Sequence, residues 1–401
     1  MSKLRICFVH EESPFSGSAC AGIARYVETM SVQMARMGHQ VYVLARNAED
    51  RTLDIGVGQL TELRPELGIW EKRAVARARP DIVHELVDIL THSLAVRRRL
   101  QELESNGGLD VIAFADWRAE GLCVGPASVT AKRLVRLHAP TVMVAYANDW
   151  DWGFRLRLLN GLERHMCERV DLLTSPSAAM ASFARERMPL RSLEPVVIPN
   201  PVDTEHFRPL PEVAQDPHVV LCVGRIEAFK GSDVLINAMP LVWRSIPQAR
   251  VVFAGGTNDW NRGWAEDLKR QWQGDDRVAF LGLVGRESLP RLYNQARVLV
   301  VPSRFESFGY TCAEGMSCGL PVVASNAGSL PELIDHERDG LLFPACDAHS
   351  LAEHIVALLR DGVLGRTLGR HAREKMVTKF ASPVVAKQMQ AVYESLLEPS
   401  V

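Results

Sequence analysis

Two cations follow a short apolar run in the second half of the sequence and stand five residues apart. Residues 219–223 have the continuous apolar character of a buried parallel strand, and Gly224, Arg225 and Lys230 come after them. Glycine permits close approach of the backbone, and an arginine fork together with a compact lysine charge suits a diphosphate. The same residues also fit a solvated loop that carries two surface cations. By itself this segment therefore does not establish a phosphate site; it predicts one only together with other suitable residues that the fold places next to it.

Two glutamates follow the next strongly apolar run, residues 298–301. Glu306 falls in the turn after this predicted strand, and Glu314 falls inside a helix whose period begins near Gly309. The amides at the start of such a helix bind phosphate, and carboxylates beside them can accept hydrogen bonds from sugar and ribose hydroxyls. Alternatively, Glu306 is an acid that the helix dipole favours, and Glu314 is an exposed helix residue.

The first half of the sequence offers three further features. Small residues before a predicted helix, Gly17 and Gly22 among them, suit backbone contact with an anion. His138 follows an apolar run and could bond a substrate hydroxyl, although a lone histidine is more often structural. Asp116 and Glu120 also follow a predicted strand, so they either bind an acceptor or belong to a solvated loop.

Short apolar runs alternate with segments of helical period throughout the chain, which predicts βαβ units and parallel sheets. Apolar spacing predicts helices over residues 22–38 and 382–397. A proline-rich stretch, residues 199–211, predicts the link between two α/β halves. The predicted strands are residues 4–10, 41–45, 81–84, 111–115, 134–138, 172–175 and 196–198 in the first half, and 219–223, 251–254, 278–281, 298–301 and 322–325 in the second.

Length and composition limit the class of protein. A chain of 401 residues exceeds the size of one growing core, so two domains are expected. The formal net charge of −2 favours neither nucleic acid nor an anionic bilayer. Eight scattered cysteines without a C-x-x-C pair predict reduced thiols and no zinc site. No apolar stretch is long enough for a membrane span, so we expect a cytoplasmic protein whose surface contact with the inner face of a membrane stays open.

Together these motifs resemble the GT-B glycosyltransferases of family 4, which are retaining enzymes. Residues 302–332, P-S-R-F-E-S-F-G-Y-T-C-A-E-G-M-S-C-G-L-P-V-V-A-S-N-A-G-S-L-P-E, resemble the E-x7-E region of that family. Residues 224–231, G-R-I-E-A-F-K-G, are similar to its G-R-x(n)-K-G loop, and residues 198–209, I-P-N-P-V-D-T-E-H-F-R-P, to its interdomain segment. Ala21 stands where the family usually has the first of two glycines, so Gly17 or Gly22 would have to serve the phosphate instead.

The resemblance implies a GT-B fold of two Rossmann-like parallel-sheet domains that face a central cleft. Residues 1–200 would form the acceptor domain, with helix 382–401 packing back on it, and residues 201–381 the donor domain.

The resemblance also implies roles for single residues. Arg225 and Lys230 would bind the diphosphate of a UDP- or GDP-linked sugar, Glu314 would hold the ribose, and His138 would contact the sugar. The remaining predicted donor contacts are Glu306, Phe308, Gly309, Tyr310 and Thr311.

The expected chemistry is transfer of a hexose-type sugar to a hydroxyl acceptor: a saccharide, a lipid-linked saccharide or a small molecule. Side-chain cations and a helix N-terminus can stabilise the departing diphosphate, so we expect neither a metal nor another cofactor. Same-face displacement is the preferred hypothesis for retention, and a covalent intermediate on Glu306 is the alternative.

Three other classes of protein fit parts of the pattern. A glycoside hydrolase or phosphorylase would use Glu306 and Glu314 as paired carboxylates and would leave the cations at Arg225 and Lys230 unexplained. An NAD-dependent Rossmann protein would need a G-x-G-x-x-G after a strand, and none occurs. A non-catalytic module would bind the nucleotide sugar without turnover.

Overall fold

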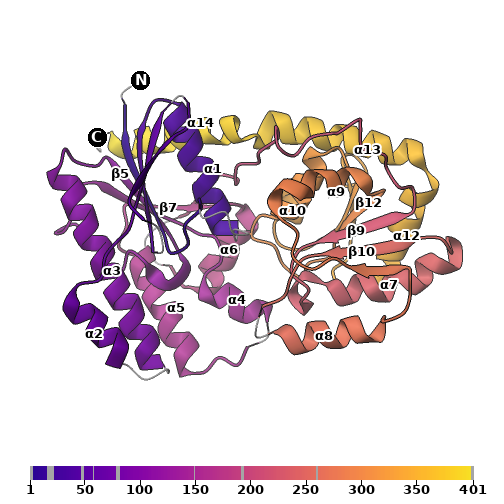
Figure 1. Cartoon of the computed structure of the whole chain (residues 1–401), viewed down its shortest axis with the longest axis horizontal. Coiled ribbons are helices and arrows are strands. Elements are labelled where there is room, and N and C mark those ends of the chain that lie inside the picture. The colour runs from indigo at the N-terminus through magenta and orange to yellow at the C-terminus, as the bar shows by residue number, and fades with distance from the viewer. Residues whose placement is uncertain are drawn as a thin grey trace. The chain divides into compact units, whose positions relative to one another are not determined.

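The chain forms two compact α/β units, each built on its own sheet (Figure 1). The first unit comprises Met1–Pro201 and Ser382–Val401, and the second comprises Val202–Ala381. The structure, a computed structural model, describes residues 3–15, 22–46, 49–56, 58–77, 82–148, 150–190, 194–258 and 261–398.

The first unit contains an eight-stranded sheet in the order β3-β4-β2-β1-β5-β6-β7-β8. All neighbouring strands are parallel except β3 and β4. Its strands are β1 (Arg5–His10), β2 (Gln40–Ala45), β3 (Arg51–Asp54), β4 (Gln59–Leu63), β5 (Val111–Ala115), β6 (Lys132–Arg136), β7 (Leu172–Ser175) and β8 (Val196–Val197).

Helices from both ends of the chain complete the core of this unit. Tyr26 and Met30 of α1 pack in one buried cluster with Phe8 of β1 and with Met389 and Tyr393 of α14. The spacing of three or four residues within each helix puts these side chains on one face, which is why the two helices bury their apolar stripes here. The helices of this unit are α1 (Gly22–Arg36), α2 (Ile69–Arg77), α3 (Ile82–Ser105), η1 (Trp117–Ala119), α4 (Thr141–Ala147), α5 (Phe154–Cys167), α6 (Ala178–Arg187) and α14 (Ser382–Leu397).

The second unit contains a six-stranded parallel sheet in the order β11-β10-β9-β12-β13-β14. Its strands are β9 (Val219–Val223), β10 (Arg250–Ala254), β11 (Val278–Phe280), β12 (Val298–Val301), β13 (Val322–Ser325) and β14 (Leu341–Phe343). Its helices are η2 (Ala228–Lys230), α7 (Ser232–Ser245), α8 (Arg262–Gln271), η4 (Arg286–Ser288), α9 (Leu289–Gln295), α10 (Tyr310–Ser317), α11 (Leu330–Leu333), α12 (Ala348–Arg360), α13 (Gly362–Lys375) and η5 (Met376–Phe380).

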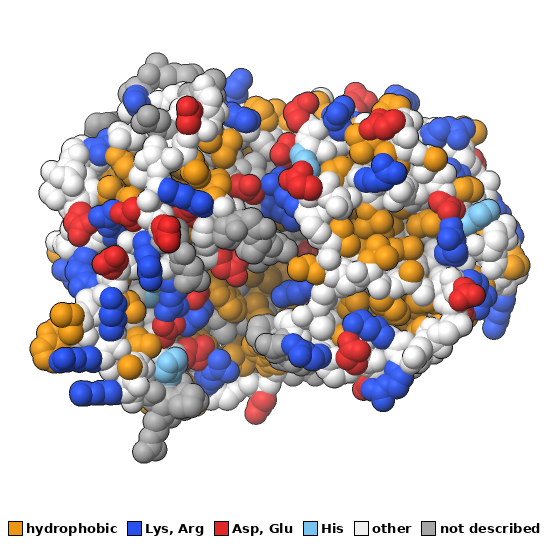
Figure 2. All heavy atoms as spheres, viewed as in Figure 1, with side chains coloured by type: hydrophobic (Ala, Val, Ile, Leu, Met, Phe, Trp, Pro, Cys, Tyr) orange, Lys and Arg blue, Asp and Glu red, His pale blue; other side chains and the backbone are white. Residues whose placement is uncertain are grey.

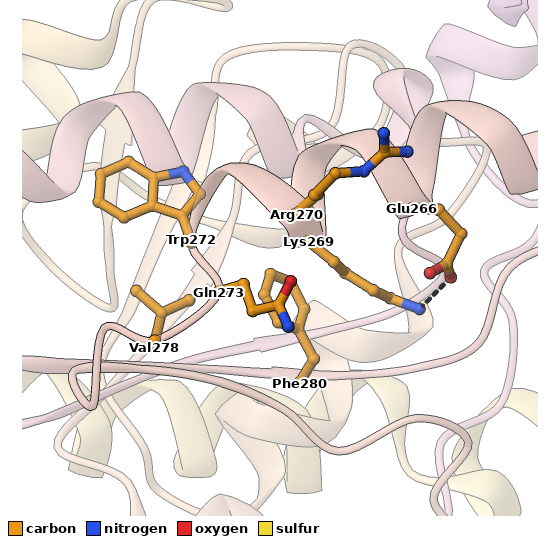
Figure 3. Close-up of a pocket in the computed structure, with 8 residues that line it drawn as sticks. Glu266, Lys269, Arg270, Trp272, Gln273, Val278 and Phe280 are labelled. Carbon is orange, nitrogen blue, oxygen red and sulfur yellow. Dashed lines mark hydrogen bonds and ion pairs between the residues drawn. The ribbon is translucent and has the colours of Figure 1, made fainter.

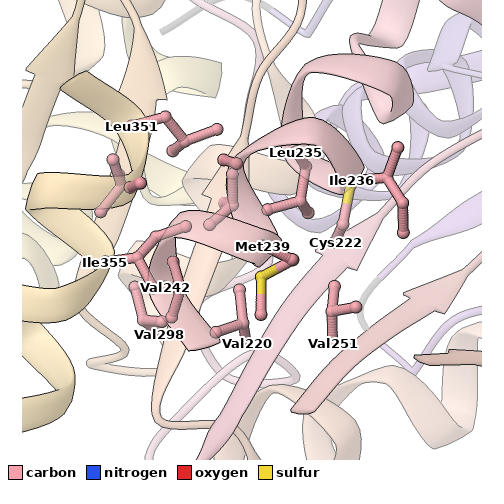
Figure 4. Packing of buried hydrophobic residues seen from close by; sticks show 14 of the residues in the cluster. Val220, Cys222, Leu235, Ile236, Met239, Val242, Val251, Val298, Leu351 and Ile355 are labelled. Carbon is pink, nitrogen blue, oxygen red and sulfur yellow. The ribbon is translucent and has the colours of Figure 1, made fainter. Parts of the chain in front are cut away.

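Both faces of the second sheet are covered, which explains its unbroken apolar strands. Val220 and Val298 pack in one cluster with Met239 of α7 (Figure 4). The next residue along each strand, Leu221 or Leu299, packs in a different cluster. Since side chains alternate between the faces of a strand, a sheet buried on both sides needs apolar residues at every position.

Each sheet has one point at which the strand order reverses. In the first unit β2 and β5 flank β1, and in the second unit β10 and β12 flank β9. At such a point, the loops that follow two neighbouring strands turn in opposite directions. A crevice therefore forms outside the carboxyl ends of these strands, and open α/β sheets bind their ligands there. The residues after β1 and β5, and those after β9 and β12, therefore occupy the two favoured positions.

The predicted fold class is confirmed, and one predicted strand is wrong. Residues 82–84 of the predicted strand 81–84 begin helix α3, while residue 81 lies outside the described residues. The two adjacent apolar residues of this segment, Ile82 and Val83, cannot be distinguished from the first turn of a helix by their periodicity. In the described part of the chain, every helix is too short or too polar to cross a membrane.

Candidate active site

The loops after β9 and β12 touch each other through their backbones. Gly231 has a φ of 70°, and a Cβ placed on it would lie 1.9 Å from the carbonyl oxygen of Pro302. The amide of Arg304 donates to the carbonyl of Phe229 over 2.8 Å. Only glycine fits at position 231, because both the backbone angle and the space exclude a side chain.

Lys230 and Glu306 meet at the switch point of the second sheet. The Nζ of Lys230 donates to Oε1 of Glu306 over 2.7 Å, and the hydroxyl of Ser303 donates to the same oxygen over 2.7 Å. The Lys230 side chain is 24% exposed and the Glu306 side chain 10% exposed. The loop after β9 thus supplies a partly accessible cation, and the loop after β12 supplies its counterion.

Helix α10 begins beside Glu306, and the second predicted acid lies within it. Gly309 precedes the helix with a φ of 89°, and the first turn carries the partial positive charge of a helix N-terminus. Glu314 is buried, and the hydroxyl of Tyr293 donates to its Oε2 over 3.0 Å. The ring of Phe308 is buried in the core, so only the backbone at this position can face a ligand. Thr311, in the first turn of the helix, is partly exposed.

Arg225 is the more exposed of the two predicted phosphate-binding cations. Its side chain is 54% exposed, and its Nη2 lies 3.0 Å from Oε1 of Glu227, which is buried. The side-chain amides of Asn258 and Asn261 donate to the other oxygen of Glu227 over 3.2 and 2.9 Å. Glu227 is therefore held in place and in turn orients Arg225.

A second ion pair joins the two loops and was missed by the sequence analysis. The guanidinium of Arg304 donates to both carboxylate oxygens of Asp233 over 2.9 and 2.7 Å. Bidentate pairs of this kind hold geometry as well as charge. The residues are 71 positions apart, and no local pattern links them. The Ser303 contact was also missed, although its position three residues before Glu306 is a usable signal.

His138 lies two residues beyond β6 and is held by a buried acid. The amides of His138 and Ala139 donate to the two oxygens of Asp116 over 2.9 and 3.4 Å. The imidazole packs edge-on against Tyr26 at a centroid distance of 4.9 Å. Burial lowers the pKa of His138 well below its ordinary range, so the ring is neutral and can both donate and accept a hydrogen bond.

Asp116 and Glu120 are buried, not solvated as one interpretation of the sequence had it. Asp116 holds the backbone at His138, and Glu120 accepts the amide of Glu11 over 2.7 Å. Both carboxylates thus link neighbouring strand ends of the first sheet. Their contact with an acceptor stays a prediction.

Glu163 supports a strained turn next to Asp116. Its carboxylate accepts the amide and hydroxyl of Thr141 over 2.8 and 2.6 Å and the amide of Arg118 over 3.1 Å. Arg118 and Ala119 have positive φ angles of 56° and 49°. Left-handed backbone in residues with a Cβ costs free energy, so these bonds have to hold the turn.

Replacing Glu163 with glutamine is expected to make the stability of the first unit less dependent on pH. Burial raises the pKa of Glu163 to about 8 from an ordinary 4.5, against hydrogen bonds from Thr141 that lower it. The folded protein therefore keeps a proton that the unfolded chain has lost, and stability falls as the pH rises between these two values. Thermal unfolding across that range measures the slope. The control is Glu168→Gln, at the partly exposed residue that follows the end of the same helix, α5. Parallel curves for wild type and Glu163→Gln would contradict the assignment.

Two remaining predictions concern loops of the first unit. Gly17 lies outside the described residues, and Gly22 is exposed at the start of α1. The expectation of no metal also assumed that the sequence has no Asp-x-Asp motif, which binds a metal in many glycosyltransferases; this was wrong, since the sequence contains Asp149-Trp150-Asp151. Asp151 is exposed, and Asp149 is not among the described residues. Across the described ranges, no three acidic, histidine or cysteine side chains form a metal-binding group.

A hollow in the second unit is a separate feature. It has a volume of about 510 Å³ and lies between α8 and the edge strand β11, with Lys269, Trp272 and Phe280 in its wall (Figure 3). None of the predicted site residues lines it.

The fold is that of the GT-B glycosyltransferases. Sucrose-phosphate synthase from Thermosynechococcus elongatus matches with a TM-score of 0.79 and 23% identity, over 98% of this chain and 99% of that chain. This likeness concerns the fold alone.

The sequence comparisons identify the family. Residues 21–206 match the family described as Glycosyltransferase Family 4, and residues 217–361 match Glycosyl transferases group 1. The chain thus carries a Glycosyltransferase Family 4 domain followed by a Glycosyl transferases group 1 domain, and it is a hexosyltransferase. Glycogen synthase of Mycobacterium tuberculosis is 27% identical over 97% of this chain and 94% of that protein. Phosphatidyl-myo-inositol mannosyltransferase of Mycobacterium leprae is 28% identical over 96% of this chain and 95% of that protein.

Proposed function

We propose that the chain is a retaining hexosyltransferase that uses a UDP- or GDP-linked sugar, needs no metal and glycosylates a hydroxyl acceptor. The observation that carries the proposal is the Lys230–Glu306 pair at the switch point of the second sheet, beside the start of α10. The family membership favours transfer over the hydrolase and dinucleotide alternatives. A glycogen synthase and a mannosyltransferase are both among the relatives named above, so the donor is left to experiment.

Lys230 and Arg225 act on the diphosphate. Cleavage of a glycosyl–phosphate bond leaves negative charge on the phosphate and develops positive charge on the sugar. A lysine ammonium has three donors, so Lys230 can keep its bond to Glu306 and also donate to a phosphate oxygen. Arg225, oriented by Glu227, adds a second cation from the same loop after β9.

The carboxylates and the imidazole act on the hydroxyls of the donor. Glu306 and the backbone of residues 308–311 grip the sugar, and Glu314, oriented by Tyr293, accepts hydrogen bonds from the ribose. Neutral His138 hydrogen-bonds a sugar hydroxyl without adding a charge that would oppose the developing positive charge.

Retention follows from attack on the face that the diphosphate leaves. The acceptor oxygen bonds to the anomeric carbon as the bond from that carbon to the phosphate oxygen breaks, and the acceptor proton passes to a phosphate oxygen. Glu306 is a poor nucleophile in this arrangement, because Lys230 and Ser303 both donate to one of its oxygens. A covalent sugar trapped on Glu306 would contradict this mechanism.

The function is tested with a panel of nucleoside diphosphates and nucleotide sugars. We expect UDP or GDP, and one of their hexose conjugates, to raise the melting temperature and bind in calorimetry with EDTA present. Glu314→Gln should weaken nucleotide binding by about tenfold, since it removes a charged hydrogen-bond acceptor. Glu353→Gln, on the exposed face of α12, is the control. Transfer that EDTA abolishes and Mg²⁺ or Mn²⁺ restores would refute metal independence, and an inverted product anomer would refute retention.

A further inference from the structure

Four charged side chains form a closed ring at the carboxyl edge of the first sheet, which we name the charge ring: Glu11, Arg46, Asp88 and Arg118. Arg46 contacts Glu11 over 2.7 Å and Asp88 over 3.0 Å. Arg118 contacts Glu11 over 3.1 Å and Asp88 over 2.7 Å. Their side chains are between 13% and 27% exposed, so the ring is partly accessible to solvent. Figure 2 shows basic and acidic side chains interspersed on this unit.

The charge ring lies at the switch point of its sheet. Glu11 follows β1, Arg46 follows β2 and Arg118 follows β5, while Asp88 comes from α3. Arg118 reaches the ring from the left-handed turn that Glu163 supports. Strained backbone that surrounding bonds maintain is found preferentially where a side chain serves a ligand.

A buried histidine–glutamate pair adjoins the ring. His10 and Glu120 are both buried, with Nδ1 and Oε1 3.4 Å apart, and that oxygen accepts the amide of Glu11. Among the residues that the structure describes, Nε2 of His10 and Oε2 of Glu120 have no hydrogen-bond partner. Buried polar atoms are usually satisfied, so these two are suited to a ligand that both donates and accepts.

The balance of charge selects the class of ligand. Two arginines and two carboxylates cancel within the ring, and the carboxylate of Glu120 lies beside it, paired with His10. A phosphate would have to displace carboxylates from both arginines and would meet these acids. Sugar hydroxyls donate to carboxylates and accept from guanidinium groups, so they can bind while every pair of the ring stays intact.

We infer that the charge ring and the His10–Glu120 pair form the acceptor subsite, and that it takes a neutral polyhydroxylated acceptor, a saccharide or a cyclic polyol, in preference to a phosphorylated one. This inference rests on the proposed function, because it presupposes an acceptor.

The first test compares matched pairs of compounds. Glucose, mannose and myo-inositol are each titrated against their monophosphates by calorimetry, with wild-type protein saturated by the nucleoside diphosphate that binds. We expect at least one neutral member to bind at least tenfold more tightly than its phosphate. Tighter binding of the phosphorylated members, or binding of none of the six, overturns the inference.

The second test changes the charge of the ring. Asp88→Asn leaves the ring with a net positive charge, so it should lose about tenfold in affinity for the neutral compound and gain affinity for its phosphate. The control is Glu85→Gln, which breaks the exposed pair with Arg155 three residues earlier on the same helix. An unchanged preference in Asp88→Asn overturns the inference. Nucleoside diphosphate binding is measured in parallel. If wild-type protein binds no nucleoside diphosphate, the proposed function is wrong, and the result does not concern the acceptor subsite.

Discussion

Lys230→Ala is expected to lower kcat/KM for the sugar donor by about 100- to 1000-fold, the usual effect of removing one preorganised donor from a developing anion. Both kcat and KM should be affected, because the ammonium group stabilises the negative charge that develops on the diphosphate as it departs. Steady-state kinetics with the donor found in the panel measure both constants.

The control for this prediction is Lys269→Ala. Lys269 forms a pair with Glu266 of the same 2.7 Å length on exposed helix α8, away from the predicted site residues. It should leave both constants unchanged. Wild-type kcat/KM in Lys230→Ala would remove the cation from the mechanism, and an equal loss in both variants would point to folding instead.

Gly231→Ala is expected to destabilise the second unit by about 3–5 kcal/mol and to abolish donor binding in the protein that still folds. The new Cβ would lie 1.9 Å from the carbonyl oxygen of Pro302, so the loops after β9 and β12 would have to separate. That separation would also part Lys230 from Glu306. Chemical unfolding and nucleotide calorimetry measure the two effects.

Gly274→Ala isolates the steric part of this cost. Gly274 has a φ of 92°, comparable with that of Gly231, but a Cβ there would meet nothing within 4 Å. It should therefore lose only about 1–2 kcal/mol, the cost of left-handed backbone with a side chain. Equal losses at the two glycines would show that the contact between the loops is not under steric constraint.

Much of the fold could be predicted because parallel strands buried on both faces are continuous apolar runs. The ranges predicted for β5, β7, β9, β12 and β13 coincide with the observed strands. Strands β3, β4 and β14 were missed because none is a long apolar run: β3 is largely exposed, β4 has Thr61 and Glu62 between its apolar residues, and β14 has only three residues. The start of α3 was taken for a strand because its first apolar residues are adjacent.

The site could be predicted as far as local spacing reaches. The sequence analysis selected Lys230 and Glu306 as a cation and an acid that each follow a strand, and in the structure these two strands are neighbours and the two side chains are in contact. The residues that hold them, Arg304 with Asp233 and Glu227 with two asparagines, come from contacts that no sequence pattern encodes. In the first unit, Asp116 was predicted to follow a strand. Its bond to the amide of His138 depends on the pairing of β5 with β6, which local sequence patterns do not encode.

The packing of α14 into the first unit has a consequence for how the protein is made. The second unit is a single stretch of chain, so it can finish folding as soon as it has left the ribosome. The first unit lacks Met389 and Tyr393 of its core until α14, which follows the whole second unit in the chain, has been synthesised. The unit that is made first can therefore be completed only after the whole second unit has been made, and until then its apolar core positions stay incompletely covered.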